Sequence, residues 1–268
     1  MNKLTHAIKN FRITRKVFCY PYVLFLMFFV LLPLVLILIN AFIKDDTFSF
    51  RNFADFFSDA TGLRVLGNSI LVGLITTVLC LAIGYPVAYI LSRQNSGRVL
   101  VLLFIMPMWI NFLIRTLSTK AIFEALNVEL GWGTVIFGMV YNYLPFMILP
   151  LHTTLSGIDK SYTEAAQDLG ADPTTVFLKT TLPLSLPGII SGITMVFVPT
   201  ISTFAITELL SDRQIYLFGD SIQMKFMQGE SMFGVGSVMS LIMLAMVLIS
   251  NFVMSRFNKG GNGGKNLW

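Results

Sequence analysis

Long apolar stretches dominate this sequence and limit the folds that are open to it. A helix of about 20 apolar residues crosses the hydrocarbon core of a bilayer, where every backbone polar group must find a partner within the protein. The chain is 55% hydrophobic and 12% charged, against about 25% charged residues in a typical soluble domain. We therefore predict an all-α polytopic membrane protein with six transmembrane helices, at residues 17–43, 66–92, 99–119, 132–155, 188–210 and 233–256.

Prolines within these spans predict departures from straight helices, since proline cannot donate a backbone hydrogen bond. We expect a kink at Pro33 in the first span, which we interpret as a retained helix rather than a cleaved signal. The third and fifth spans, with Pro107 and Pro199, are each predicted as one crossing. Between the fifth and sixth spans, Phe218 and Ile222 recur with Phe226 at a four-residue spacing, which predicts a short amphipathic helix.

The basic residues predict the orientation of the spans. With both termini on the cytoplasmic side, the inner segments hold 12 Lys and Arg and the outer segments hold 7. Cytoplasmic segments of membrane proteins carry this excess, so we expect a multi-pass protein of the cell membrane with N and C termini inside. Three regions follow: 1–64, with the N-terminal tail, first helix and outer loop; 65–256, the transmembrane domain; and 257–268, a disordered cytoplasmic tail.

One long polar segment, residues 157–187, lies on the cytoplasmic side of this topology. Ser161, followed three residues later by Glu164, predicts a capping box at the start of a helix. That helix is expected to end at Gly170, because glycine best adopts the left-handed conformation just past a helix end.

A second short helix is predicted directly after the first. Asp172 is its expected N-cap and Pro173 its first residue. We expect it to end near Leu182, because Pro183 interrupts helical hydrogen bonding. On spacing alone, an ordinary connection between membrane helices remains an alternative for this segment.

The residues of this segment also follow a family pattern. Glu-Ala-Ala, then glycine, then Leu-Pro at these spacings resembles the EAA loop of ATP-binding-cassette importer permeases. The resemblance implies a type I importer permease fold in which the loop is a coupling helix that docks on a separate cytoplasmic ATPase. The coupling residues it implies are Glu164, Ala165, Ala166, Gly170, Leu182 and Pro183. The pattern departs at Thr180, where the family has an apolar residue, and we expect Val176 and Phe177 to supply that contact.

Two further segments narrow the resemblance. Residues 107–116 (PMWINFLIRT) and 140–151 (VYNYLPFMILPL) resemble the spermidine/putrescine branch of this family. The branch implies a second homologous permease subunit, two copies of the ATPase and an extracytoplasmic polyamine-binding protein as partners. Branches that transport ferric ion, sulfate or thiosulfate share the loop and remain alternatives.

The residue inventory excludes several other functions. The sequence has no G-x-x-x-x-G-K-[ST] phosphate loop, so we predict a transport subunit rather than an enzyme, with ATP hydrolysis by a partner. Its two cysteines and two histidines are placed too far apart for a metal site, and we expect no cofactor. Basic residues are not interleaved with aromatic ones as in nucleic-acid-binding proteins. An ion-gradient carrier, the alternative from another class, would need paired midplane charges or inverted repeats, which we do not find.

A few polar and aromatic residues within the spans are candidates for the substrate path. Glu208 is an acid near the outer end of the fifth span, and such an acid costs free energy unless it faces a partner or water. It contacts either a passing ammonium group or a structural partner, Arg115 or Arg213. Aromatic rings bind cations through their faces, although in membrane helices they more often serve packing. The aromatic candidates are Trp109, Tyr141, Tyr143 and Phe204.

Overall fold

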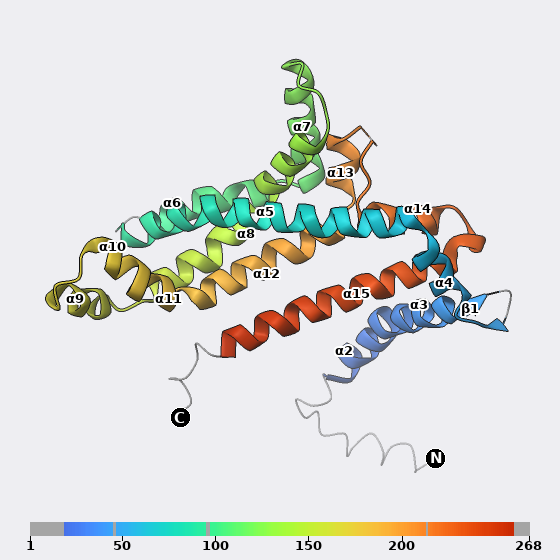
Figure 1. Cartoon of the computed structure of the whole chain (residues 1–268), viewed down its shortest axis with the longest axis horizontal. Coiled ribbons are helices and arrows are strands. Elements are labelled where there is room, and N and C mark those ends of the chain that lie inside the picture. The colour runs from blue at the N-terminus through green and yellow to red at the C-terminus, as the bar shows by residue number, and fades with distance from the viewer. Residues whose placement is uncertain (1–18, 45–46, 95–96, 213, 260–268) are drawn as a thin grey trace, which may run out of the picture.

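The computed structural model describes residues 19–44, 47–94, 97–212 and 214–259 and is an elongated helical bundle (Figure 1). The N-terminal tail predicted at 1–16 lies outside these residues, as does most of the tail predicted at 257–268. Four helices are long and apolar enough to cross a membrane, and six crossings result if each of two bent helix pairs counts as one. The six spans are therefore present, but two of them are not single helices.

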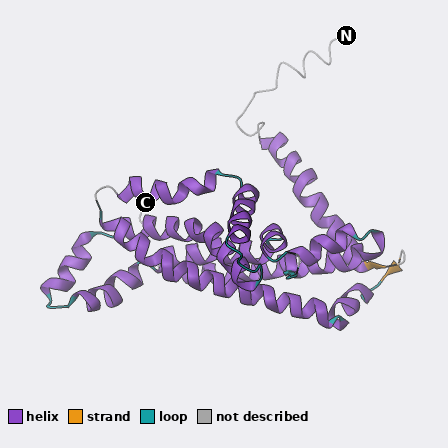
Figure 2. Cartoon of the chain, turned by 90° about the horizontal axis from the view of Figure 1, so that it is seen from above, coloured by secondary structure: helices purple, strands orange, loops and turns teal. Residues whose placement is uncertain are grey.

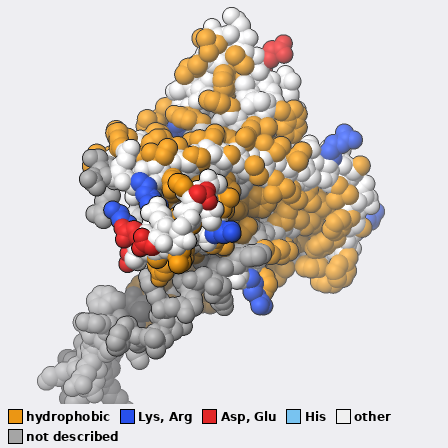
Figure 3. Space-filling model, turned by 60° about the vertical axis from the view of Figure 1, so that its left-hand side comes forward, with side chains coloured by type: hydrophobic (Ala, Val, Ile, Leu, Met, Phe, Trp, Pro, Cys, Tyr) orange, Lys and Arg blue, Asp and Glu red, His pale blue; other side chains and the backbone are white. Residues whose placement is uncertain are grey.

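The first span lies at the edge of the bundle and faces lipid. It consists of α2 (Cys19–Leu26), a π-helical stretch η1 (Met27–Leu31) and α3 (Leu32–Phe42). The helix is continuous through Pro33, where we expected a kink, and the π-helical stretch ends two residues before the proline. Within the described span, Ala41 alone is buried, and α3 packs against the last helix while α2 diverges from the bundle (Figure 2). Hydrophobic side chains cover the flanks of the molecule (Figure 3).

A compact element follows the end of this span. The strands β1 (Ile43–Lys44) and β2 (Thr47–Phe48) form a small antiparallel hairpin that the all-α prediction missed, and α4 (Arg51–Ser58) follows. The side-chain amide of Asn52 donates to the carbonyl of Ile43 at 2.9 Å and to that of Ala41 at 3.2 Å. Ala41 lies in the last turn of α3, whose carbonyls have no intrahelical donors, and Ile43 is the residue directly after the helix, so Asn52 caps the first span.

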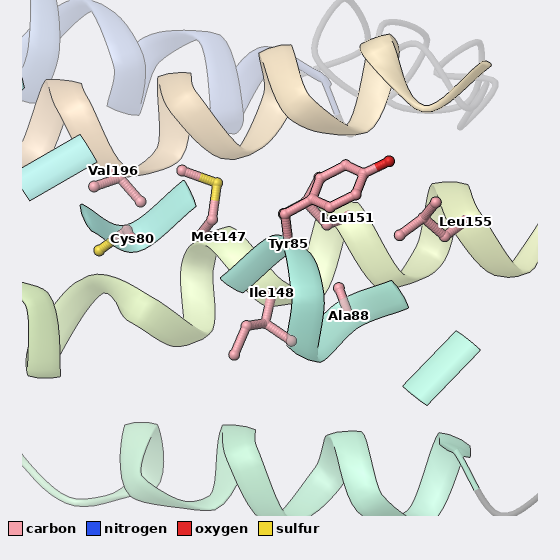
Figure 4. Packing of buried hydrophobic residues seen from close by; sticks show 8 residues of the cluster. All are labelled: Cys80, Tyr85, Ala88, Met147, Ile148, Leu151, Leu155 and Val196. Carbon is pink, nitrogen blue, oxygen red and sulfur yellow. The ribbon is translucent and has the colours of Figure 1, made fainter. Parts of the chain in front are cut away.

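Three helices form the centre of the bundle: α5 (Ala60–Arg93), α8 (Trp132–Ser156) and α12 (Leu186–Ser202). Figure 4 shows the packing of Cys80, Tyr85 and Ala88 of α5 and Val196 of α12 with four residues of α8: Met147, Ile148, Leu151 and Leu155. Glycines allow the close approach: a Cβ at Gly192 would lie 2.5 Å from the sulfur of Met147. Small residues at such contacts are typical of helices packed within a membrane.

The third span is broken rather than continuous, which corrects the prediction. Its parts are α6 (Gly97–Ile105), the 3₁₀ turn η2 (Met106–Trp109) and α7 (Phe112–Ala125), and the two arms meet at 88°. Proline alone does not explain the break, because α5 and α8 continue through their prolines. At this break, Asn111 also accepts from the N–H of Leu113 at 2.9 Å and starts a new helix. The side-chain cap competes with helix continuation.

The fifth span ends earlier than predicted. The helix α12 ends at Ser202, Thr203 is extended, and the six-residue helix α13 (Ala205–Leu210) follows. After it come α14 (Phe218–Met227) and α15 (Glu230–Lys259). The predicted amphipathic helix is confirmed as α14: Phe218 is fully buried, and the ring of Phe226 contacts that of Phe233 with centroids 5.5 Å apart.

The polar segment forms the opposite end of the bundle from the β-hairpin (Figures 1 and 2). It contains α9 (Lys160–Asp168), α10 (Pro173–Val176), the π-helical stretch η3 (Phe177–Thr181) and α11 (Leu182–Leu184). The Asp172 cap and the position of Pro173 are confirmed, as is the left-handed Gly170, with φ of 83°. The N-cap of α9 was predicted wrongly: Asp159, not Ser161, accepts from the backbone, from the N–H of Ser161 at 2.9 Å.

The end of the second helix was also predicted wrongly. Helical structure continues through Leu182 and Pro183 to Leu184, and the chain turns at Ser185, where the helices on either side meet at 62°. Pro183 lies in the first turn of α11, where a missing N–H costs least. In the preceding π-helical stretch the carbonyls are spaced differently from those of an α-helix, which would otherwise clash with the ring of Pro183.

We expect Gly234→Ala to destabilise the protein, because the added Cβ would lie 2.6 Å from Cγ of Asn52. Asn52 is 3% exposed and cannot move away without releasing the end of α3. Overpacking of this kind costs about 1–3 kcal/mol. The measurement is thermal unfolding of the detergent-solubilised protein. Gly67→Ala is the matched control, because nothing lies within 4 Å of its added Cβ. Equal unfolding temperatures for the two variants would contradict the capping role of Asn52.

Candidate functional site

The two helix breaks meet at one cavity. It has a volume of about 520 Å³ and is bordered by the break in the third span and by the end of α12. Its lining residues include Trp109, Asn111, Arg115, Asn142, Tyr143 and Thr203. Within a membrane, irregular backbone is stable only where it is buried in protein or lines a cavity. Discontinuous helices therefore mark binding sites in membrane transport proteins.

Arg115 is the charged residue of this cavity and is nearly buried, with 7% exposure. Its Nε donates to Oδ1 of Asn142 at 2.8 Å, and its Nη1 donates to the carbonyl of Pro107 at 2.9 Å. The ring of Tyr141 lies under the guanidinium, 5.4 Å from its central carbon. These contacts differ from the pair of Arg115 with Glu208 that we considered from the sequence, because the guanidinium is directed to neutral oxygens and a ring.

The aromatic candidates separate into different environments. Trp109 and Tyr143 line the cavity, and Trp109 is 81% exposed. The hydroxyl of Tyr143 donates to the carbonyl of Pro199 at 3.4 Å. Tyr141 instead stacks on Phe137 and covers Arg115, and Phe204 is a half-exposed residue at the start of α13. Two of the four candidates thus lie together at the cavity.

Glu208 lies in another cavity, of about 300 Å³. Asp220 of α14 and the hydroxyl-bearing Tyr216 line it as well. Asp220 is 6% exposed and accepts from the N–H of Leu217 at 2.7 Å. Its burial raises the pKa of its carboxyl to about 7, and the nearby charge of Glu208 adds to this effect. Arg213, the other partner considered for Glu208, lies outside the described residues.

Sequence reasoning did not identify Asp220 and Asn142 as site residues. Asn142 offered a signal, since it is a polar residue within an apolar span and lies between two tyrosines. Asp220 offered a weaker one: it is the third residue of α14, where a carboxylate caps a helix start. Its position opposite Glu208 depends on how α13 and α14 fold back on each other, which local sequence does not specify.

The coupling residues predicted from the EAA-like pattern lie on the exposed end of the bundle. Glu164 and Ala165 of α9 are exposed, as is Pro183, while Ala166 and Leu182 are half-buried. Apolar side chains are exposed beside them: Leu169 is 89% exposed and Tyr162 58%. Hydrogen bonds to the carboxylates stabilise both short helices, since the backbone N–H of Ser161 lowers the pKa of Asp159 and the hydroxyl of Thr175 lowers that of Asp172.

This end of the molecule is firmly attached to the central helices. The ring of Phe177 packs edge-on against Tyr85 and Tyr89 of α5, with centroids 5.8 and 5.4 Å apart. The hydroxyl of Tyr85 is 2.9 Å from that of Ser185, at the turn into α12. Val176 is buried beside Phe177, so both residues make apolar contacts within the chain at this end, and their replacement of the family's apolar residue at Thr180 stays a prediction.

Comparison with known proteins places the chain in a family. Residues 83–260 match the family described as the inner membrane component of binding-protein-dependent transport systems. The chain is 34% identical over 259 residues to the spermidine/putrescine transport system permease protein PotB of Haemophilus influenzae, an alignment that covers 87% of this chain and 90% of that protein. It is 32% identical over 258 residues to PotB of Escherichia coli K12, covering 86% of this chain and 94% of that protein.

Solved structures share the fold at low sequence identity. A bacterial alginate ABC transporter, in complex with its pentasaccharide-bound periplasmic protein, superposes with a TM-score of 0.67 and 13% identity, over 91% of this chain and 94% of that chain. The inward-facing MetNI methionine ABC transporter gives a TM-score of 0.61 and 16% identity, over 75% of this chain and 95% of that chain. The chain therefore belongs to the inner-membrane components of binding-protein-dependent transport systems and has the fold of ABC importer permeases.

Proposed function

We propose that this chain is the permease subunit of an ATP-driven importer for polyamines, spermidine or putrescine, and that it forms half of the translocation pathway. The observation that carries the proposal is its 34% identity to a spermidine/putrescine permease over 90% of that protein's length. The cavity between the two helix breaks supports it, because it gives a passing solute a polar, aromatic-lined site within the bundle.

The cavity's aromatic residues suit a polyamine. Trp109 and Tyr143 offer ring faces to ammonium groups, and each such contact is worth about 0.5–2 kcal/mol. Glu208, in the other cavity with Asp220, offers a charge-assisted hydrogen bond. Tyr141 acts indirectly, through Arg115, and Phe204 lies beside the second break.

One observation favours a second candidate, an anion such as sulfate. The guanidinium of Arg115 borders the cavity, and a positive group there attracts anions and repels ammonium groups. Against this, its donors are already engaged by Asn142 and Pro107, and a ring covers one face. We therefore favour the polyamine and include sulfate in the test.

The partners follow from the same proposal. A second homologous permease subunit completes the pathway, two copies of a cytoplasmic ATPase hydrolyse ATP, and an extracytoplasmic binding protein captures the polyamine. The exposed apolar residues Leu169 and Tyr162 beside Glu164 support a protein-docking role for the α9 end. The excess of Lys and Arg on that side supports a cytoplasmic location for it and for both termini.

The first test is uptake of radiolabelled spermidine and sulfate by vesicles that contain the assembled complex. We expect ATP-dependent spermidine uptake, and sulfate uptake in its place would establish the second candidate. Trp109→Ala should slow spermidine uptake roughly 2- to 30-fold, the range that corresponds to one cation–π contact. Glu208→Gln should also slow it, because the carboxylate is lost while the shape is kept.

Matched controls are available for both variants. Trp132→Ala removes an indole at the start of α8, and Glu129→Gln neutralises an exposed outer acid; neither residue lines the two cavities. If Trp109→Ala and Glu208→Gln transport spermidine as well as these controls, the proposed path is wrong.

Gly170→Val should uncouple ATP hydrolysis from uptake. Its φ of 83° is in the left-handed region, where a Cβ costs about 1–2 kcal/mol, so α9 would be displaced relative to α10. Ala171→Val places the same side chain one residue further on, where φ is not positive. We expect substrate-stimulated ATPase activity and substrate uptake to be retained in Ala171→Val and lost in Gly170→Val. Equal behaviour of the two would refute the coupling role.

Thiol labelling tests the orientation. In a background with Cys19→Ser and Cys80→Ala, cysteines at Ser58 and Glu129 should react with an impermeant reagent added outside intact cells. One at Thr174 should react only after the membrane is opened. All three positions are exposed. Labelling of Thr174→Cys in intact cells would contradict the predicted topology.

A further inference from the structure

One side chain bridges the break in the third span. Arg115 lies in the first turn of α7, and its Nη1 donates to the carbonyl of Pro107, which precedes the break. Its Nε donates to Oδ1 of Asn142 on α8, and Nη2 reaches the same oxygen. The guanidinium therefore connects η2, α7 and α8, the three elements that form one wall of the cavity.

The surroundings of Arg115 hold it in this geometry. Asn142 is 2% exposed, and its Nδ2 donates to the carbonyl of Gly138 at 2.7 Å, which turns its oxygen toward Arg115. The backbone carbonyl of Pro107 also accepts from the N–H of Ile110 at 3.3 Å, so the guanidinium is a second donor to it, from the far side of the break. Hydrogen bonds to a charged group are stronger than neutral ones.

The geometry suits a guanidinium and no other cationic side chain. Arginine presents five donors in a rigid planar fork, whereas lysine carries a compact charge on a flexible stem. The acceptors of Arg115 lie on two different helical segments, at 2.8 and 2.9 Å from two different nitrogens. A lysine ammonium at this position would keep the charge but could not reproduce both bonds together.

We propose that Arg115 is a positioning residue that holds the third span at its 88° bend and so keeps the cavity open. The bend places Trp109 and Asn111 with Asn142 in the lining of the cavity. Without the bridge, η2 is free to move toward α12 and close the space between the two breaks. The role depends on the shape of the fork and not on its charge, and it holds whichever solute the cavity carries.

The test measures access to the cavity without any substrate. Ser202→Cys, on the opposite wall, is placed in the Cys19→Ser, Cys80→Ala background of the assembled complex in vesicles. A small water-soluble methanethiosulfonate reagent then reports how open the cavity is. We expect Arg115→Gln, Arg115→Lys and Asn142→Ser each to slow labelling about tenfold, the factor set by the loss of one such hydrogen bond.

Additivity and controls identify the bridge itself. The double variant Arg115→Gln with Asn142→Ser should label no more slowly than Arg115→Gln alone, because that variant already removes the bond to Asn142. Arg64→Gln removes an exposed arginine at the start of α5 and should leave labelling unchanged. Glu129→Cys, in the outer loop, should label at one rate in every background and so reports intact assembly.

Two results would overturn the proposal. If Arg115→Lys labels at the unmodified rate while Arg115→Gln does not, the charge matters and the fork does not. If Arg115→Lys and Asn142→Ser both label normally, the bridge does not hold the cavity open. Should Arg115→Gln fail to assemble, Asn142→Ser tests the same expectation. It removes the bond from Arg115 to α8 and keeps the bond to Pro107.

A fall in maximal uptake at unchanged half-saturation should accompany slower labelling, and only this uptake measurement depends on the proposed function.

Discussion

The need to pair every backbone polar group inside a membrane determines where this chain can depart from helix. Its central helices satisfy that need within themselves, and α5 remains continuous for 34 residues even with Pro86 inside it. The departures are confined to a few places, and side chains supply partners at several of them: Asn52 at the end of α3, Asn111 and Arg115 at the break in the third span. Because free backbone groups are stable only beside protein or a cavity, the two breaks and the cavity between them are one structural feature.

Sequence reasoning predicted the number and order of the spans because hydrophobicity over about 20 residues is a strong signal. It did not predict that the third span is bent or that the helix of the fifth span ends at Ser202. Pro107 and Pro199 occur in these spans, but Pro86, Pro145 and Pro150 occur in continuous helices, so proline does not by itself predict a break. What differs at the third span is a set of side-chain bonds, from Asn111 to its own helix start and from Arg115 across the break. Those bonds depend on tertiary contacts that a linear pattern does not contain.

The candidate site, like the fold, combines features that local sequence determines with features that tertiary contacts determine. The positions of Gly170, Asp172 and Pro173 follow local rules of helix capping and were predicted correctly. The proposed path residues are determined by distant contacts, and the structure places Trp109 and Tyr143 at one cavity and Glu208 at another. Asp220 joins Glu208 because α14 folds back beside α13. Asp159, and not Ser161, caps α9, because the helix begins two residues earlier than a Ser161 cap predicts, directly after the extended Asp159.

The arrangement of α12 gives a physical route between the two ends of the molecule. Its 17 residues rise about 26 Å, from the turn at Ser185 to the break after Ser202 that borders the cavity. At the Ser185 end, the contacts of Tyr85 with Ser185 and of Phe177 with Tyr85 and Tyr89 attach it to the segment that carries α9. Along its length, glycines bring it against Met147 and Thr154 of α8 with no space for an added Cβ. Interiors packed this closely transmit strain, and α12 is the continuous helix that joins the turn at Ser185 to the wall of the cavity.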